Sequence, residues 1–361
     1  AEPPAEGGAR PVSVRVRRAP GTARYNARTV ESPSNSQLPS QSPSLSERFA
    51  LGDKGALARV ISWAENNDRR FPAFFSQLWP KVGRARRIGV TGPPGAGKST
   101  LVNELARAVR AQSRTVGILA VDPSSPFTGG ALLGDRIRME ERTADSGVYI
   151  RSMASRKSHG GLSRAAVDAC DAMDGFGLDE IVLETVGVGQ AEYDVVSAAD
   201  TVLVVLCPGA GDGIQAMKAG ILEVADVLVV NKAELPGADR LIVDLSEAAH
   251  IRTAGRGKWT PPVVAASAGR GEGIDDVLAA IAAHRAHLGE AGLALARREK
   301  RVAQVRRVFD ERMSEQLWER GGWTERARGL LDAGVSTYDV VSELHATLAS
   351  LAASVGGRST T

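Results

Sequence analysis

Apolar residues follow two alternating patterns along the middle of the chain. Short runs that are apolar on both faces indicate buried strands, and they alternate with segments in which apolar residues recur at helical spacing. Buried strands separated by helices are typical of a largely parallel sheet with helices on both faces. The pattern therefore predicts an α/β fold. The expected strands are residues 87–90, 115–121, 148–153, 180–184, 201–207, 227–230 and 262–266.

The two ends of the chain differ from this middle part, which we place at residues 86–288. Residues 1–43 are rich in Pro, Ser, Gly and Arg without an apolar period, which predicts a disordered tail; a targeting remnant and a plain tail both stay open. Residues 44–85 predict a helical segment of two short helices, punctuated by Pro72 and Pro80. After about His287 the chain becomes helical and charged. The C-terminal arm, 289–361, is expected to hold further helices at 324–333 and 337–354.

A glycine-rich stretch follows the first expected strand. Gly92 and Gly97 are separated by four residues and are followed at once by Lys98 and Ser99. This is the full P-loop spacing, in which glycines let backbone amides turn toward phosphate oxygens at the start of a helix. Lys98 would reach the β and γ phosphates, and the Ser99 hydroxyl would bind Mg²⁺. The predicted phosphate-binding residues are Gly92, Pro94, Gly95, Ala96, Gly97, Lys98, Ser99 and Thr100.

Two expected strands end in an acidic residue. Asp122 follows one strand, and Glu184 ends another with Gly187 three residues later. Because ligands bind at the carboxyl ends of parallel strands, both carboxylates should face the phosphates. A carboxylate at a buried strand end is costly without a metal ion or hydrogen-bond donors, which favours Mg²⁺ binding over a solvated strand end. The Gly187 amide would sense a γ-phosphate and move when it leaves.

A possible base-recognition motif, Asn231-Lys232-Ala233-Glu234, follows a later strand. In GTPases an Asn-Lys-x-Asp motif at this place binds guanine, because the carboxylate accepts from the ring N1 and the exocyclic amine while the lysine stem packs on the base. Glu234 keeps two acceptors but changes their reach, so guanine is favoured over adenine. Ser267 and Ala268, after the last strand, would supply a backbone amide for the guanine oxygen.

Composition narrows the classes of partner. The chain has 361 residues, 43% hydrophobic and 24% charged, with a net charge of +3, which is ordinary for a soluble protein. No Lys/Arg-rich run with interleaved aromatics is present and no apolar run reaches membrane length, so neither nucleic acid nor a membrane is expected. Cys170 and Cys207 form no Cys-x-x-Cys pair, which argues against a disulfide framework or zinc site. A reducing compartment fits: the cytoplasm or, alternatively, the mitochondrial matrix.

Taken together, these residues resemble the methylmalonyl-CoA mutase-associated GTPases, a P-loop NTPase family related to the human cobalamin-disorder type A protein and once labelled arginine/lysine/ornithine transport kinases. The resemblance is close over residues 86–288 and loose over the flanking helices. It rests on residues 92–100, 119–125, 128–135 with Arg138 and Met139, 184–190, and 208–212 with Gln215, Lys218 and 220–223.

The resemblance implies a GTPase chaperone of an adenosylcobalamin-dependent acyl-CoA mutase. Such a protein gates cofactor loading, protects the mutase from inactivation and forms a homodimer through its C-terminal helices. Carried over to this sequence, it assigns Mg²⁺ to Ser99, Asp122, Asp135 and Glu184. It also implies switches at 122–138 and 184–190, and a third mobile loop at 209–218 that carries the nucleotide state to the mutase. No cobalamin site is identifiable in this chain.

Two positions depart from the family pattern. Glu234 replaces the usual Asp, and residues 152–159 differ from the usual Pro-Ser-rich run before Gly160 and Gly161, which leaves partner contact there open.

The expected chemistry is in-line attack of water on the γ-phosphorus, with Lys98 and Mg²⁺ neutralising the developing charge. No residue is an obvious arginine finger in cis, so Gln190 and Lys218 are the candidates to complete the site once a partner reorders it. We therefore expect slow turnover alone and faster turnover with the mutase. Three alternatives stay open: a P-loop small-molecule or protein kinase, a nickel metallochaperone GTPase despite the lack of a Cys/His ligand cluster, and a nucleotide-binding scaffold without turnover.

Overall fold

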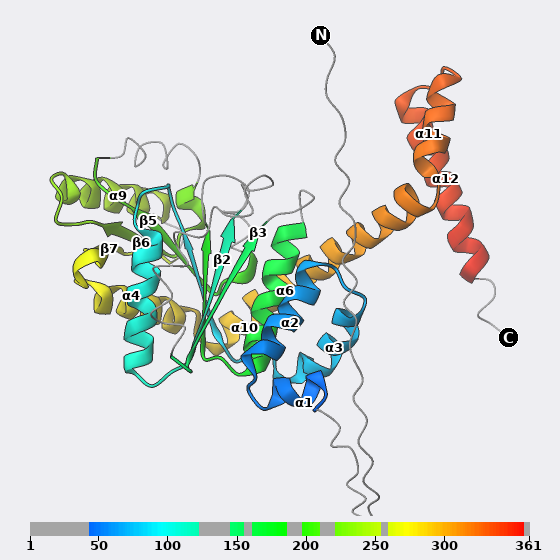
Figure 1. Ribbon diagram of the computed structural model, residues 1–361. Helices are drawn as coiled ribbons and strands as arrows, with labels where there is room; N and C mark the ends of the chain where they lie inside the picture. The colour runs from blue at the N-terminus through cyan, green and yellow to red at the C-terminus, as the bar shows by residue number, and fades with distance from the viewer. Residues whose placement is uncertain are drawn as a thin grey trace, which may run out of the picture. The chain divides into compact units, whose positions relative to one another are not determined.

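A seven-stranded parallel sheet forms the centre of the protein in the computed structural model, which describes residues 43–122, 145–154, 161–185, 197–209, 221–253 and 259–356 (Figure 1). The strand order is β3-β2-β4-β1-β5-β6-β7, and neighbouring strands are parallel throughout the sheet. Each strand predicted from the sequence is confirmed to within one residue at either end. The strands are β1 (Arg86–Thr91), β2 (Val116–Asp122), β3 (Val148–Ala154), β4 (Glu180–Thr185), β5 (Thr201–Leu206), β6 (Val227–Asn231) and β7 (Val263–Ala266).

Side chains that alternate along the strands pack into cores on the two faces of the sheet. On β5, Leu203 and Val205 pack with α4 (Lys98–Ala111) and α10 (Ile274–Ser314), whereas Val202 and Val204 pack with α9 (Ala238–Thr253). The helix α6 (Gly161–Phe176) covers β2, β3 and β4 on that second face. Because strands covered on both faces must be apolar on both faces, the continuous apolar runs of the sequence are explained.

The segment before β1 contains three α-helices, so the prediction of two short helices is wrong. They are α1 (Leu45–Ala50), α2 (Lys54–Glu65) and α3 (Arg70–Leu78), followed by the short 3₁₀ helix η1 (Trp79–Lys81). The Asp53 side chain accepts hydrogen bonds from the amides of Gly55 and Ala56 and starts α2 separately from α1. Pro72 lies in the first turn of α3, where a missing N–H costs nothing, so it marks a helix start and not a break.

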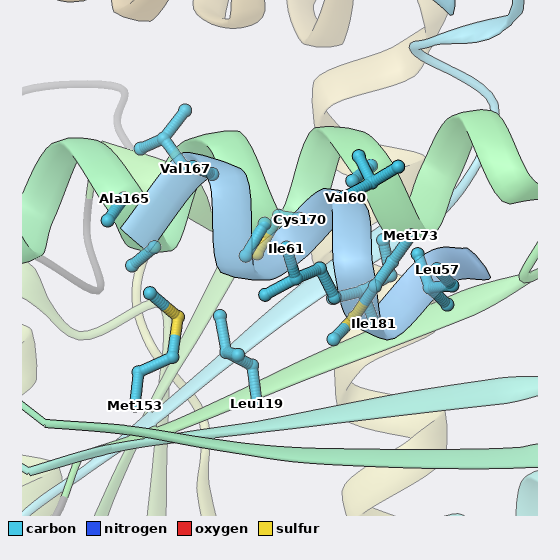
Figure 2. Close-up of a cluster of buried hydrophobic side chains, with 14 of the residues drawn as sticks. Leu57, Val60, Ile61, Leu119, Met153, Ala165, Val167, Cys170, Met173 and Ile181 are labelled. Atoms are coloured by element: carbon cyan, nitrogen blue, oxygen red, sulfur yellow. The ribbon is translucent and has the colours of Figure 1, made fainter. Parts of the chain in front are cut away.

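The helix α2 lies beside α6 over the sheet. Figure 2 shows side chains of both helices, among them Ile61 and Cys170, above Leu119 and Met153 of the strands. All four side chains are almost completely buried, and Cys170 is a core residue as predicted. The helices before β1 therefore complete the core and are not merely an appendage.

The long helix α10 begins at Ile274, earlier than the sequence predicted, and its geometry breaks at Gly289. Gly289 has φ 60° and ψ 177°, outside the helical region, so two helices meet there. A π-helical turn, η4 (Glu315–Arg320), then leads to α11 (Trp323–Asp332) and α12 (Thr337–Gly356), which confirms the two later helices. None of the helices in the described ranges is long and apolar enough to cross a bilayer.

A cluster of buried ion pairs lies at the amino end of the sheet. Arg87, at the start of β1, donates to Asp171 at 2.7 Å and to Asp174 at 2.8 Å, both on α6. Arg301 of α10 donates to both carboxylate oxygens of Asp171 at 2.5 Å. Asp174 also accepts from the amides of residues 83–85, directly before β1. These ion pairs connect α6, α10 and β1. We call Arg87, Asp171, Asp174 and Arg301 the amino-end ion cluster.

Candidate nucleotide-binding site

The loop between β1 and α4 has the backbone geometry of a phosphate cradle. Gly92 has φ +137°, and a Cβ built on it would stand 2.1 Å from the Val205 carbonyl oxygen of β5. Gly97 has φ +86°, and its Cβ would stand 2.3 Å from Nδ2 of Asn231. No other residue type fits either position, since both the space and the left-handed backbone exclude a side chain. Gly92 is therefore required by the close approach of the β5 backbone, and Gly97 by its left-handed backbone and the nearby Asn231 side chain.

Lys98 is the first residue of α4, and its side chain is buried. The ammonium group donates to the carbonyl oxygens of Gly92 at 2.7 Å and Pro93 at 3.0 Å, so the side chain folds back over the loop that precedes it. Carbonyl and phosphate oxygens are both acceptors for an ammonium group with three donors. The position of Nζ over the loop fits the role that the sequence assigned to it.

Ser99 at the start of α4 contacts Glu184 near the end of β4. The Ser99 hydroxyl donates to Oε1 of Glu184 at 2.5 Å, and the Glu184 carboxylate is buried next to α4. Glu184 pairs through its backbone with Val90 of β1 and with Ala120 of β2, so it is fixed in register beside the cradle. A hydroxyl and a carboxylate are hard oxygen donors of the kind that Mg²⁺ prefers. This donor pair fits the predicted metal ion.

The other predicted metal and switch residues are placed only in part. Asp122 is the last residue of β2, and its backbone pairs with Ala154 of β3, two residues beyond the partner of Glu184. Within the described ranges, no group of three or more His, Cys, Asp or Glu side chains forms a metal site. Four predicted residues lie outside the described residues, together with most of the three predicted mobile segments: Asp135, Gly187, Gln190 and Lys218.

Asn231, at the end of β6, connects the loop to the last strand. Its Nδ2 donates to the carbonyl oxygen of Ala96 at 2.8 Å, and its Oδ1 accepts from the Ala268 amide at 3.0 Å. Lys232 donates to the Gly95 carbonyl oxygen at 2.8 Å. The sequence assigned these residues to the base but did not predict that they also hold the phosphate loop, since these bonds span more than a hundred residues of chain.

Glu234 is exposed and lies near Ser267. A hydrogen bond from the Ser267 side chain, and a weaker one from its own amide, hold the pKa of the Glu234 carboxyl below its usual range. The carboxylate therefore stays ionised at neutral pH and keeps both of its acceptor oxygens. The structure brings Asn231, Lys232, Glu234 and Ser267 to one end of the cradle, next to Gly95 and Gly97.

The family model described as methylmalonyl Co-A mutase-associated GTPase MeaB matches residues 57–321 of this chain. The chain belongs to the MeaB family. The match begins inside α2 and covers α3, the whole sheet and α10.

Relatives of this MeaB-family protein carry related names. A protein of Pyrococcus horikoshii that bears a GTPase name is 45% identical over 262 residues, 72% of this chain and 83% of that protein. GTPase ArgK of Escherichia coli is 33% identical over 279 residues, 75% of this chain and 84% of that protein. The mouse methylmalonic aciduria type A homolog, mitochondrial, is 39% identical over 194 residues, which cover 53% of this chain and 47% of that protein.

The fold also matches a solved structure. The crystal structure of a LAO/AO transport system kinase has a TM-score of 0.64 and 25% sequence identity, with 84% of this chain and 96% of that chain covered. The predicted P-loop fold is thus confirmed. As a MeaB-family protein the chain is a GTPase that hydrolyses GTP to GDP and phosphate, and it is related to the methylmalonic aciduria type A protein.

Proposed function

We propose that this GTPase is the chaperone of an adenosylcobalamin-dependent acyl-CoA mutase, and that it uses a Mg²⁺-bound nucleotide to gate cofactor loading and to protect the mutase. The bond between Ser99 and Glu184 is the observation that carries the metal-bound nucleotide switch, because it joins the start of α4 to the strand that leads into the second predicted switch. The family's description supports the mutase as the partner.

The proposed ligands of Mg²⁺ are Ser99, Asp122, Asp135 and Glu184. When bound, Mg²⁺ neutralises negative charge on the phosphate groups during hydrolysis. Lys98 would leave the carbonyl oxygens of Gly92 and Pro93 for the β and γ phosphates, and it would hold positive charge at the transferring group. The loop amides would orient the phosphates, since the glycines bring the backbone close enough to bind them.

The proposed guanine site lies at the other end of the cradle. Glu234 would accept from the ring N1 and the exocyclic amine, and the stem of Lys232 would pack on the base. Asn231 would keep this end in register with the phosphate loop through its bond to Ala96. We assign the guanine oxygen to a backbone amide of Ser267 or Ala268. Because the Ala268 amide bonds Asn231, base binding would be coupled to the loop.

Turnover is proposed to be slow until the mutase binds. Gln190 and Lys218 are the candidates to orient water and to stabilise the transferring group, and each belongs to a segment that a partner would order.

The arm after Gly289 is proposed as the dimerisation element: Val302, Val305 and Phe309 on α10 are exposed apolar residues at helical spacing. A second copy covering this face would remove apolar surface from water.

Binding and hydrolysis measurements with GTP, ATP and XTP, with and without a cobalamin-dependent mutase, test this proposal. We expect GTP to be preferred, and its steady-state hydrolysis to rise when the mutase is added. A preference for ATP would move the function to a phosphoryl-transfer kinase. Hydrolysis that is fast alone and unchanged by the mutase would refute the chaperone role while leaving the GTPase intact.

A further inference from the structure

Two buried threonines are bonded to each other where β1 and β4 end. Thr91 is the last residue of β1 and Thr185 is the last residue of β4. The Thr185 hydroxyl donates to Oγ1 of Thr91 at 3.1 Å, and neither residue is exposed to solvent. The backbone pairing of the two strands ends one residue earlier, at Val90 and Glu184. The side-chain bond therefore extends the pairing of the strands by one step.

Each threonine adjoins a residue of the nucleotide site. Thr91 precedes Gly92, the first glycine of the cradle, and Thr185 follows Glu184. Successive side chains of a strand point to opposite faces of a sheet. Glu184 meets Ser99 on the face covered by α4, so Thr185 points to the other face. A bond that holds Thr185 on one face thus limits rotation of the strand end, and with it the direction of the carboxylate on the other face.

We propose that Thr91 and Thr185 are a positioning pair for Glu184. The hydroxyl bond fixes the end of β4 against the end of β1 and keeps the Glu184 carboxylate directed at Ser99. Both threonines are completely buried, so both would act through Glu184. The inference rests on the proposed function, specifically on the assignment of Glu184 to Mg²⁺.

The pair offers a way to separate position from stability. Valine has the shape of threonine without the hydroxyl, so Thr185→Val leaves the buried Thr91 oxygen without this donor and destabilises the fold. Replacing both threonines by valine removes both polar groups, and such a pair of changes is often close to neutral for stability. Serine at position 185 keeps the hydroxyl. If the hydrogen bond between the two hydroxyls positions Glu184, the Mg²⁺ concentration needed for nucleotide binding should rise in every variant that lacks this bond. The rise should not follow the stability of the variant.

The test measures the Mg²⁺ concentration for half-maximal binding of a fluorescent, non-hydrolysable GTP analogue, together with the free energy of unfolding. We expect Thr185→Val and the double valine variant to need about tenfold more Mg²⁺. A tenfold change corresponds to the free energy that one hydrogen bond typically contributes. Thr185→Ser should bind like the wild type. The matched control is Thr201→Val, which removes a buried hydroxyl that bonds His284 at 2.9 Å at the other end of the sheet. It should lower stability and leave the Mg²⁺ requirement unchanged.

Two results would overturn the inference. One is a double valine variant that regains the wild-type Mg²⁺ requirement as it regains stability; the other is a Thr185→Val variant that needs no more Mg²⁺ than Thr201→Val. Failure of the proposed function gives a different result: analogue binding by the wild type would not depend on Mg²⁺, or Glu184→Gln would need no more Mg²⁺ than the wild type.

Discussion

The two ends of the parallel sheet hold their charged side chains in different ways. At the amino end, Arg87 and Arg301 both bond the buried carboxylate of Asp171, so charge is held by opposite charge. At the carboxyl end, the partners of Lys98 include backbone carbonyl oxygens, and the partners of Glu184 include a neutral hydroxyl. Phosphate oxygens or a metal ion can take the place of such neutral partners, whereas a buried ion pair loses much when either partner is removed. Substitutions at the amino end should therefore mainly change the free energy of unfolding, and substitutions at the carboxyl end should mainly change nucleotide binding and hydrolysis.

The largest effect should come from the carboxyl end. Lys98→Ala removes the ammonium group that we assign to the β and γ phosphates, so GTP turnover should fall by at least about 10³-fold, or about 4 kcal/mol of barrier. Its free energy of unfolding should fall by only about 1–3 kcal/mol, because the change leaves the carbonyl oxygens of Gly92 and Pro93 without this buried donor. Phosphate release and chemical denaturation measure the two quantities. Lys81→Ala, at an exposed lysine of η1, is the control and should alter neither. Normal turnover in Lys98→Ala would remove this lysine from the site.

The amino end should give the reverse result. Arg87→Met keeps the size of the side chain but takes a donor from Asp171 and Asp174, and breaking a buried ion pair costs about 3–5 kcal/mol. Nucleotide affinity of the folded variant should stay within a few-fold of the wild type. Arg107→Met, which removes the exposed pair with Glu104, should cost about 0–1 kcal/mol. Equal stability losses in the two arginine variants, or lost GTP binding in folded Arg87→Met, would contradict the division between the two ends.

The sequence predicted the carboxyl end far better than the amino end. The glycines and Lys98 of the loop are consecutive or nearly so, and their chemistry depends on local spacing. The rule that ligands bind at the carboxyl ends of parallel strands placed Glu184 beside Ser99, and the role of Asp122 stays a prediction. Apolar runs placed all seven strands because a strand buried on both faces has a continuous signature. The mutual order of the strands gave no local signal and had to come from the structure.

The amino-end ion cluster could not be predicted in this way. Arg87 bonds a residue 84 positions away, and Arg301 bonds the same carboxylate from 130 positions away. Neither has a spacing that distinguishes it from the many exposed arginines of the chain. The sequence did not predict the bond of Asn231 to the loop or the bond between Thr91 and Thr185 for the same reason. The helix count before β1 was too low for a different reason: the prediction did not separate α1 from α2, where the Asp53 side chain caps the second helix.

A pH effect should also belong to the amino end. Burial, and then the neighbouring Asp171, raise the pKa of Asp168 to about 7, although Arg164, Arg301 and Gln304 of α6 and α10 oppose the rise. The unfolded carboxyl has a pKa near 3.9, so from about pH 4 to pH 7 the folded state binds the extra proton. Stability contributed by this proton is present at low pH and is lost as pH rises through about 7.

Asp168→Asn should remove this loss, since the amide stays neutral and can still accept from Gln304. Relative to the wild type, its free energy of unfolding should rise by roughly 2–3 kcal/mol between pH 5 and pH 8. Urea denaturation across this range measures the difference. Asp310→Asn, at an exposed position on α10, is the control and should give a flat difference. A flat difference for Asp168→Asn as well would mean that Asp168 is ionised in the fold throughout.

The smallest effect should lie at the guanine end of the cradle, where Glu234 takes the place usual for aspartate. Shortening it by Glu234→Asp keeps the ionised carboxylate and restores the usual reach, so discrimination between GTP and ITP, which lacks the exocyclic amine, should rise by about three- to tenfold, or about 1 kcal/mol. Competition binding of the two nucleotides gives this ratio, and Glu223→Asp on η2 controls for the loss of one methylene elsewhere. Ser267 bonds Glu234 and precedes Ala268, whose amide bonds Asn231. A second explanation for the glutamate is therefore that its longer side chain supports this neighbouring loop and does not bind the base. In that case Glu234→Asp would leave the ratio unchanged and lower affinity for both nucleotides equally, which separates base recognition from support of the loop.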